Sequence, residues 1–223
     1  MIKPVRYGIA AAYVFLTLFL AGCSVAPTRP VENAALAWQA REARLQQITA
    51  WDIQGRLVLR SGDEGGQMSL HWRRDGENDV IDLSGPLGKR LLRLSQNPAG
   101  AELRDAEQKI FRAENAQVLL FNTTGWQVPL AGLHYWILGI PVPAAAERHS
   151  LDERGRLKSL SQWGWDIRLL DYARYNDEEL PRRLSLRLLP ETATDGSINT
   201  DAARQTPVLE LRLIIAQWTL TTP

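Results

Sequence analysis

The chain has 223 residues, of which 45% are hydrophobic and 23% are charged, with 26 lysines and arginines against 25 aspartates and glutamates. This length and apolar content suit one domain with a packed core, and the balanced charge excludes a broad basic surface that would attract nucleic acid. Eight tryptophans are many for this length, and they indicate large buried contacts or side chains near lipid headgroups.

The first 22 residues have the layout of a secretory signal. Two basic residues, Lys3 and Arg6, precede an apolar run of 14 residues that ends at Leu20. The run is shorter than the roughly 20 residues that a membrane-spanning helix needs. It leads into Leu20-Ala21-Gly22-Cys23, which resembles the bacterial lipobox, where the cysteine is lipidated and becomes the first residue of the mature protein. We therefore expect removal of residues 1–22 and lipid attachment at Cys23.

A mature chain that starts at Cys23 has no disulfide and must fold by packing alone. Without Lys3 and Arg6 it carries 24 basic residues against 25 acidic ones. Residues 23–32 form a tether in which prolines interrupt regular structure, and Ser24 is compatible with sorting to the outer membrane. The alternatives for the whole segment are an ordinary signal peptide with a chance cysteine and a short membrane anchor.

The next part of the chain predicts one helix and then a series of strands. Residues 33–49 contain no glycine or proline and place apolar side chains such as Trp38 and Leu45 on one face, although Arg41 interrupts that face. From Trp51 onward the apolar period changes from 3.6 to 2, which is typical of half-buried strands. The expected strands of this part are residues 51–60, 68–73, 81–83, 92–94, 101–105 and 109–112.

The middle of the chain is expected to be helical, over residues 114–121 and 129–139, with Pro141 preventing continuation of the second helix. Strands then resume over residues 157–162, 163–169, 184–188 and 208–220, with the polar stretch 191–205 as a loop. The pattern indicates a single domain over residues 33–223. Its class is mainly β with helices (α+β), and because long sheets twist, we expect a curled antiparallel sheet that forms an incomplete barrel. Helices form a lid on the apolar side of this sheet around an apolar cavity.

The chain offers little reactive chemistry. Its three histidines have no metal-ligand spacing, and no nucleophile elbow or phosphate-binding loop is present in the sequence. Acidic runs such as Asp152-Glu153 are interpreted as solvated turns, and His71 and His134 as solvated or structural side chains. The sequence therefore predicts a protein that is not an enzyme and that holds no metal or cofactor.

Several motifs in order resemble the LolB family of outer-membrane lipoproteins, which receive other lipoproteins from the periplasmic carrier LolA. They are the lipobox at Cys23, the strand start 51–57 (Trp-Asp-Ile-Gln-Gly-Arg-Leu), the turn 85–88 (Gly-Pro-Leu-Gly) and the segment 126–141 with Trp-Gln-Val-Pro-Leu at its start. The resemblance implies acceptance of acyl chains into an apolar cavity and insertion of the lipoprotein into the outer membrane. It implies a LolA-type carrier, lipoprotein acyl chains and outer-membrane lipid as partners, no nucleic acid, and a monomer.

The resemblance, combined with the strand periods, gives a set of candidate site residues. We expect the lid of the cavity to contain Trp136 and Ile137, and we expect Leu87, at a tight turn where a polar residue is usual, to project and enter the bilayer. A plain core role is the alternative for each cavity residue, and a leucine folded back onto the core is the alternative for Leu87. The expected cavity wall consists of Leu57, Leu59, Leu70, Trp72, Ile81, Leu83, Leu92 and Leu94.

Two other functions remain open at this point. A structural or assembly lipoprotein that binds a protein partner through its curved sheet would have a dense core instead of a cavity. A periplasmic hydrolase would need converging polar residues inside the sheet, where the alternating pattern places leucines instead.

Overall fold

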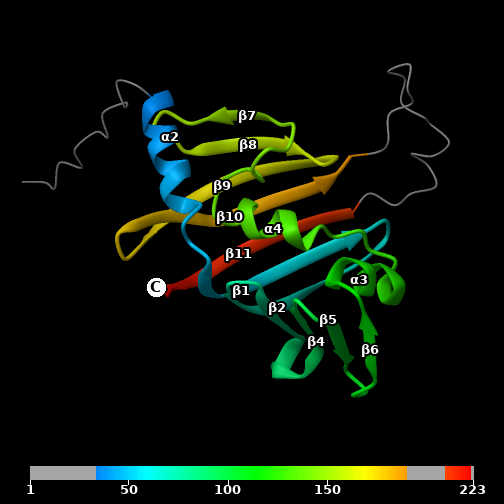
Figure 1. Ribbon diagram of the computed structural model, residues 1–223. Helices are drawn as coiled ribbons and strands as arrows, with labels where there is room; N and C mark the ends of the chain where they lie inside the picture. The colour runs from blue at the N-terminus through cyan, green and yellow to red at the C-terminus, as the bar shows by residue number, and fades with distance from the viewer. Residues whose placement is uncertain (1–33, 190–208, 222–223) are drawn as a thin grey trace, which may run out of the picture. The chain divides into compact units, whose positions relative to one another are not determined.

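The computed structural model describes residues 34–189 and 209–221, which build one antiparallel sheet with helices against one of its faces (Figure 1). The signal segment, Cys23, the tether and the expected loop at 191–205 lie outside the described residues. The inner face of the sheet is defined as the face that carries the helices, and the outer face is the opposite one.

Eleven strands form the sheet in two consecutive meanders. The order across the sheet is β6-β5-β4-β3-β2-β1-β11-β10-β9-β8-β7. The meanders meet where β1 pairs with β11, and β6 and β7 are the two edges, so the sheet is open. The strands are β1 (Ala50–Ser61), β2 (Glu64–Asp75), β3 (Asn78–Ser84), β4 (Arg90–Asn97), β5 (Gly100–Asp105), β6 (Ile110–Ala113), β7 (Arg148–Leu151), β8 (Leu157–Gln162), β9 (Trp165–Tyr175), β10 (Glu178–Leu188) and β11 (Leu209–Leu220).

The junction of the two meanders depends on a glycine. The register of β1 against β11 shifts by one residue between Gln54 and Gly55, because β11 carries the extra residue Ala216. At this point Gly55 lies so close to β11 that an added Cβ would be 2.1 Å from the carbonyl oxygen of Ile214. A side chain at this position would therefore push the two central strands apart. The extra residue leaves the alternation of β1 unbroken, whereas the buried side chains of β11 pass from Ile215 to Trp218, three residues on.

Three helices lie on the inner face: α2 (Ala34–Leu45), α3 (Ala116–Thr124) and α4 (Leu130–Trp136). In Figure 1, α2 crosses β7–β10 at one end of the strands, α4 lies over the middle of the sheet and α3 lies near β5 and β6. The side chain of Asn115 caps α3 by accepting a hydrogen bond from the Val118 amide, and Gly125 ends α3 with a φ of 74°. Among the helices described, none is long and apolar enough to cross a membrane.

The fold confirms the expected class, but several elements differ from the sequence-based prediction. The prediction contains no strand at β7, and β10 begins at Glu178 instead of Leu184. The first helix ends at Leu45, because the chain turns there before β1 begins. Trp163, expected within a strand, instead lies in the turn between β8 and β9 with a φ of 52° and an exposed side chain. Trp163 follows the period-2 pattern of Trp165 and Ile167, so the pattern alone could not separate the turn from the strand.

The β7–β10 half of the inner face is densely packed under α2 and α4. Buried Trp38 and Leu45 of α2 contribute to this half, and buried Trp165 and Ile167 of β9 contribute from the sheet. Arg41, the residue that interrupts the apolar face of α2, is also buried, and it donates a hydrogen bond to the carbonyl oxygen of Glu179. The buried face of α2 can therefore include Arg41, because the carbonyl oxygen of Glu179 accepts a hydrogen bond from its guanidinium group.

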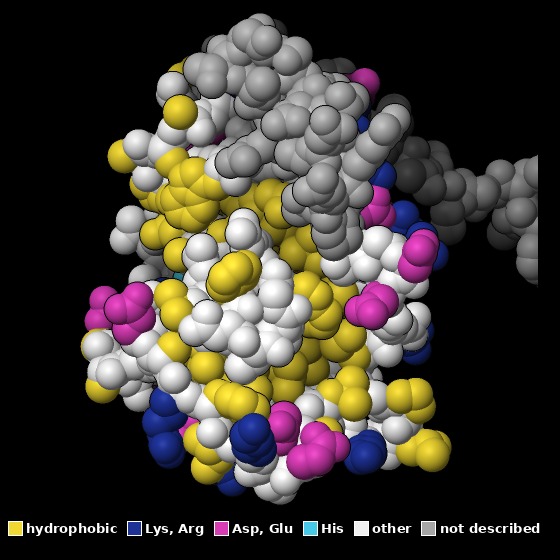
Figure 2. Space-filling view, turned by 90° about the vertical axis from the view of Figure 1, so that its right-hand side faces the viewer, with side chains coloured by type: hydrophobic (Ala, Val, Ile, Leu, Met, Phe, Trp, Pro, Cys, Tyr) yellow, Lys and Arg dark blue, Asp and Glu magenta, His cyan; other side chains and the backbone are white. Residues whose placement is uncertain are grey.

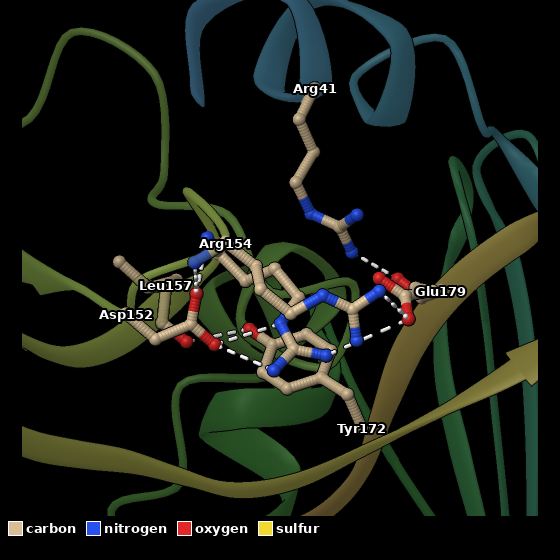
Figure 3. Close-up of polar contacts among 7 residues, drawn as sticks. Arg41, Asp152, Arg154, Leu157, Tyr172 and Glu179 are labelled. Carbon is tan, nitrogen blue, oxygen red and sulfur yellow. Dashed lines mark hydrogen bonds and ion pairs between the residues drawn. The ribbon is translucent and has the colours of Figure 1, made fainter. Parts of the chain in front are cut away.

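A polar cluster fixes α2 to the ends of these strands (Figure 3). The guanidinium of Arg156 stacks on the Tyr172 ring at 4.6 Å and pairs with Asp152 at 2.7 Å. Arg154 pairs with Glu179 at 3.0 Å. The Tyr172 hydroxyl donates to the carbonyl oxygen of Leu157, and burial raises the pKa of this hydroxyl far above its usual value. These groups pair mainly with one another, which indicates a structural role, and only Nε of Arg41 in the cluster is buried without a hydrogen-bond partner.

Candidate functional site

The other half of the inner face encloses an apolar cavity. Its walls come from β1–β4 and β11, and its cover comes from α3, the α3–α4 connection and the start of α4. Every lining residue is Leu, Ile, Val or Trp: Leu57, Leu59, Leu70, Trp72, Ile81, Leu83, Leu92, Leu94, Leu120, Trp126, Val128, Leu130, Leu133, Leu211 and Leu213. The cavity can therefore bind apolar chains and offers little that would select a polar group.

The structure places all eight strand residues proposed from the sequence in this one wall. They are inward-facing residues of four neighbouring strands, and the ladders bring them together: Leu70 lies opposite Leu83, Trp72 opposite Ile81, and Leu83 opposite Leu92. A period of 2 fixes which residues share a face, and antiparallel pairing of consecutive strands then makes that face continuous.

The expected lid residues Trp136 and Ile137 do not line the cavity. Both are fully buried, and Trp136 packs against Trp165 with ring centroids 6.3 Å apart. The indole N–H of Trp136 donates to the side chain of buried Gln162 at 2.9 Å. The two residues lie on the same face as Leu133 but at the other end of α4: the first turn, with Leu130 and Leu133, covers the cavity, while the last turn packs on the β7–β10 half.

The cover and β11 supply the lining residues that the sequence-based prediction missed. Leu120, Trp126 and Val128 belong to α3 and to a connection without strand periodicity, so no pattern could assign their side chains to the cavity. Leu211 and Leu213 follow a clear period of 2, but their place in the wall depends on the pairing of β11 with β1, which are far apart in sequence. The sequence alone shows only the alternation of β11 and does not show its partner strand.

One end of the cavity is closed by aromatic rings and the other end is open. Trp72 packs edge-on against Trp51 at 5.0 Å, and Trp51 in turn packs against Trp218 at 5.7 Å. At the opposite end the lining residues Leu57, Leu92 and Trp126 are only partly buried. Figure 2 shows the side of the molecule toward which β1 runs, and hydrophobic side chains gather in a broad area across its middle.

A buried carboxylate fastens α4 to the sheet beside the cavity. Asp79 of β3 accepts hydrogen bonds from the Trp72 indole at 2.9 Å and from Arg74 at 2.7 Å. His134 of α4 lies 3.1 Å from the same carboxylate and packs against the Trp72 ring at 5.5 Å. His134 is therefore structural, and His71 pairs with Asp52 at 2.8 Å on the outer face. Within the described residues no group of His, Cys, Asp and Glu is arranged to hold a metal ion.

The turn between β3 and β4 presents an unusual leucine beside the open end. Leu87 lies within a single 3₁₀ turn (η1, Pro86–Gly88), has a φ of 63° and is fully exposed. A left-handed conformation costs a residue with a side chain roughly 1–2 kcal/mol, and glycine or asparagine would adopt it at lower cost. Because β3 and β4 both line the cavity up to this turn, Leu87 projects from the rim of the open end.

The cavity is narrow in this structure, with a volume of ≈ 80 Å³. Pockets that enclose drug-sized ligands have volumes of roughly 300–1,000 Å³. The lining is therefore already apolar in this structure, but the cavity would have to widen to hold a ligand of that size.

Comparison with known proteins identifies the family. The family model described as "Outer membrane lipoprotein LolB" matches residues 49–218. The outer-membrane lipoprotein LolB of Nitrosococcus oceani is 35% identical over 207 residues, which cover 91% of this chain and 93% of the relative. Its counterpart in Alkalilimnicola ehrlichii is 37% identical over 170 residues, covering 76% and 84%.

A solved structure agrees with the fold alone. A DUF1329 family protein from Desulfovibrio piger superimposes with a TM-score of 0.51 at 6% identity, over 87% of this chain and 95% of that protein. The sequence relatives carry the assignment, since the family model and the relatives span strands and helices of both meanders. This chain therefore belongs to the LolB family of outer-membrane lipoproteins.

Proposed function

We propose that this protein is an outer-membrane acceptor that takes lipoproteins from a LolA-type periplasmic carrier, holds their acyl chains in the apolar cavity and inserts them into the outer membrane. Its action is a transfer without covalent chemistry. The observation that carries the proposal is the wholly apolar cavity whose open end lies beside the exposed Leu87.

The driving force is the burial of acyl chains. Each CH₂ group removed from water contributes roughly 0.8 kcal/mol, so a lipoprotein with several chains must pass from one apolar environment to another. A wall of aliphatic side chains supplies this affinity without fixed polar groups, and it therefore suits many lipoprotein clients. The same wall must release the chains to the bilayer, which a cavity with strong specific contacts would slow.

Loading widens the cavity on the side of its cover. Each strand of the wall is hydrogen-bonded to a neighbouring strand on both sides, because the sheet edges are β6 and β7. The connection between α3 and α4, in contrast, belongs to no strand ladder. Trp126 and Val128 of this connection are therefore the cover residues whose displacement costs the least free energy. His134 and Trp136 hold α4 to the sheet during this movement through Asp79 and Gln162.

Delivery uses Leu87 and a membrane tether. In this proposal residues 1–22 are removed, Cys23 carries the lipid, and residues 23–32 connect the anchor to the domain over residues 33–223, which faces the periplasm. Stable anchoring needs more than one acyl chain. Leu87 enters the lipid beside the open end of the cavity, so that a chain leaving the cavity meets the bilayer at that point.

A transfer assay tests the proposal. A LolA-type carrier from the same organism is loaded with a radiolabelled lipoprotein and mixed with this protein, and the label is followed by separation of the two proteins. Transfer of the label to this protein is expected. Retention of the label on the carrier, with this protein folded, would contradict the proposal and favour an assembly lipoprotein with a protein partner.

A further inference from the structure

The outer face of β1–β4 and β11 is hollowed into a basic depression of ≈ 710 Å³, on the opposite side of the sheet from the cavity. Arg56, Arg73, Arg90 and Arg93 line it together with one carboxylate, Asp82. This surface has a strong positive excess, although the chain as a whole is nearly neutral. Nothing in the acyl-chain cavity uses these arginines.

Three of the arginines converge on Asp82. Arg93 donates two hydrogen bonds to its carboxylate at 2.8 and 2.7 Å, Arg90 lies 3.3 Å from it, and Arg73 lies 4.0 Å from it. The Asp82 side chain is 13% exposed, whereas those of Arg73 and Arg90 are 49% and 45% exposed. One covered carboxylate thus holds the three guanidinium groups in place, and it leaves most of their charge and several donors facing outward.

The depression adjoins the exposed turn. Arg90 follows Leu87 by three residues, a separation of at most about 11 Å, and exposed Lys89 lies between them. The polar layer of a bilayer extends roughly 5–7 Å beyond the hydrocarbon on each side, and long arginine side chains reach back toward charged groups. When Leu87 enters the acyl region, Lys89 and Arg90 lie at the level of lipid phosphates, with Arg93 and Arg73 behind them.

We propose that Lys89, Arg90, Arg93 and Arg73 form a phosphate-binding surface for anionic phospholipid headgroups, which orients the Leu87 turn on the outer membrane. The inference rests on the proposed function, because it assumes that Leu87 enters the bilayer. An apolar tip beside clustered cations matches a lipid interface. An acidic protein partner would match the cations, but it would leave the exposed, strained leucine without a role.

Chemical protection of single arginines tests this surface in the full chain. The protein is placed in nanodiscs of phosphatidylcholine alone or of phosphatidylcholine mixed with phosphatidylglycerol, and phenylglyoxal modification of each arginine is followed by mass spectrometry. One cation near an anionic membrane surface changes the affinity for that surface by about fivefold. We therefore expect the rate of modification of Arg90 and Arg93 to fall at least severalfold when the nanodiscs contain phosphatidylglycerol. Arg168, Arg183 and Arg187, on exposed positions of β9 and β10, serve as internal controls with unchanged rates.

Each other outcome overturns the inference. Equal slowing at both sets of arginines would indicate a general charge effect. Equal protection by inorganic phosphate added to phosphatidylcholine nanodiscs would indicate a site for free anions. Protection of Arg90 and Arg93 by a loaded LolA-type carrier, without phosphatidylglycerol, would assign the surface to an acidic protein partner.

A second readout separates this inference from the proposed function. Hydrogen exchange of the 84–90 turn in the same nanodiscs reports entry of Leu87 into lipid. Slowed exchange without arginine protection would refute only the phosphate-binding surface, whereas exchange unchanged by the membrane would refute delivery through Leu87. The paired change Arg90→Gln with Arg93→Gln should slow lipoprotein delivery to vesicles with phosphatidylglycerol severalfold, while Arg183→Gln with Arg187→Gln should not.

Discussion

Leu83 and Leu92 lie directly opposite each other in the β3–β4 ladder, and both form part of the cavity wall. The residues between them form the turn that exposes Leu87. The same two strands therefore build the wall of an apolar cavity and carry an apolar side chain beyond its rim. In the proposed function, this continuity links the binding of an acyl chain to its delivery.

Replacement of Leu87 should separate delivery from binding. Leu87→Glu places a charge where the side chain would enter lipid, so we expect insertion of lipoproteins into vesicles to fall strongly. The side chain contacts little of the fold, and the free energy of unfolding should change by less than about 0.5 kcal/mol. Both quantities are measured on the same preparation, by vesicle flotation of a labelled lipoprotein and by urea unfolding. Normal insertion by this variant would remove Leu87 from the mechanism.

The backbone of Leu87 provides a matched variant. Glycine adopts the observed φ of 63° without steric cost, so Leu87→Gly should stabilise the fold slightly, by up to about 1 kcal/mol. It should nevertheless deliver lipoproteins poorly, because the apolar tip is lost. A variant that is more stable and still fully active would show that the conformation of the turn matters and that the leucine side chain does not.

Adjacent leucines of β4 distinguish the two faces of the sheet. Leu92 lines the open end of the cavity, whereas Leu91 is exposed and is absent from the cavity lining. Leu92→Glu introduces a charge into an apolar site, and we expect binding of a fluorescent apolar probe to weaken at least tenfold. Leu91→Glu should leave probe binding within about twofold of the original protein. Equal effects of the two substitutions would contradict the assignment of the cavity.

Removal of Asp79 should destabilise the attachment of α4. Asp79→Ala leaves Arg74 and the Trp72 indole without their buried acceptor, and breaking such a pair costs about 3–5 kcal/mol. Asp79→Asn keeps an acceptor for the indole and should cost less. Urea unfolding measures both variants. If Asp79→Ala has the same free energy of unfolding as the original protein, the carboxylate of Asp79 does not fasten α4 to the sheet.

Acid should weaken the fold through Asp82 and Asp152. Burial alone would raise the pKa of each carboxyl. At Asp82 the hydrogen bonds from Arg93 and the charges of Arg93, Arg90 and Arg73 together outweigh burial and lower the pKa. At Asp152 the hydrogen bonds from Arg156 and Arg154 and the charge of Arg156 together do the same. Such groups stabilise the protein above the unfolded pKa of about 4. This contribution is lost as the pH falls through the lower, folded pKa.

The measurement is the free energy of unfolding in urea at several pH values between neutrality and acid. The double variant Asp82→Asn with Asp152→Asn should be less stable than the original protein at neutral pH. It should also lose less stability on acidification. Parallel pH profiles for the two proteins would show that these carboxyls are not the groups responsible.

The sequence predicted the parts of the site that depend on local periodicity. Residues such as Leu57 and Leu70 alternate with polar neighbours, and consecutive strands pair in an antiparallel meander, so a shared face follows from the chain order. The same reasoning failed for Trp136, because Trp136 shares a face of α4 with the lining residue Leu133 and periodicity cannot tell which turn of the helix covers the cavity. Trp126 had no periodic context, and Leu211 needed the non-local pairing of β11 with β1.

The central claim is that acyl chains occupy the cavity between the sheet and the cover. A lipoprotein with photoreactive diazirine groups on its acyl chains, transferred to this protein and irradiated, would label the residues that touch the chains, and mass spectrometry would locate them. We predict labels on cavity residues such as Leu57, Leu83 and Leu133. Labels confined to the outer face, or to the densely packed half around Trp165, would contradict the account.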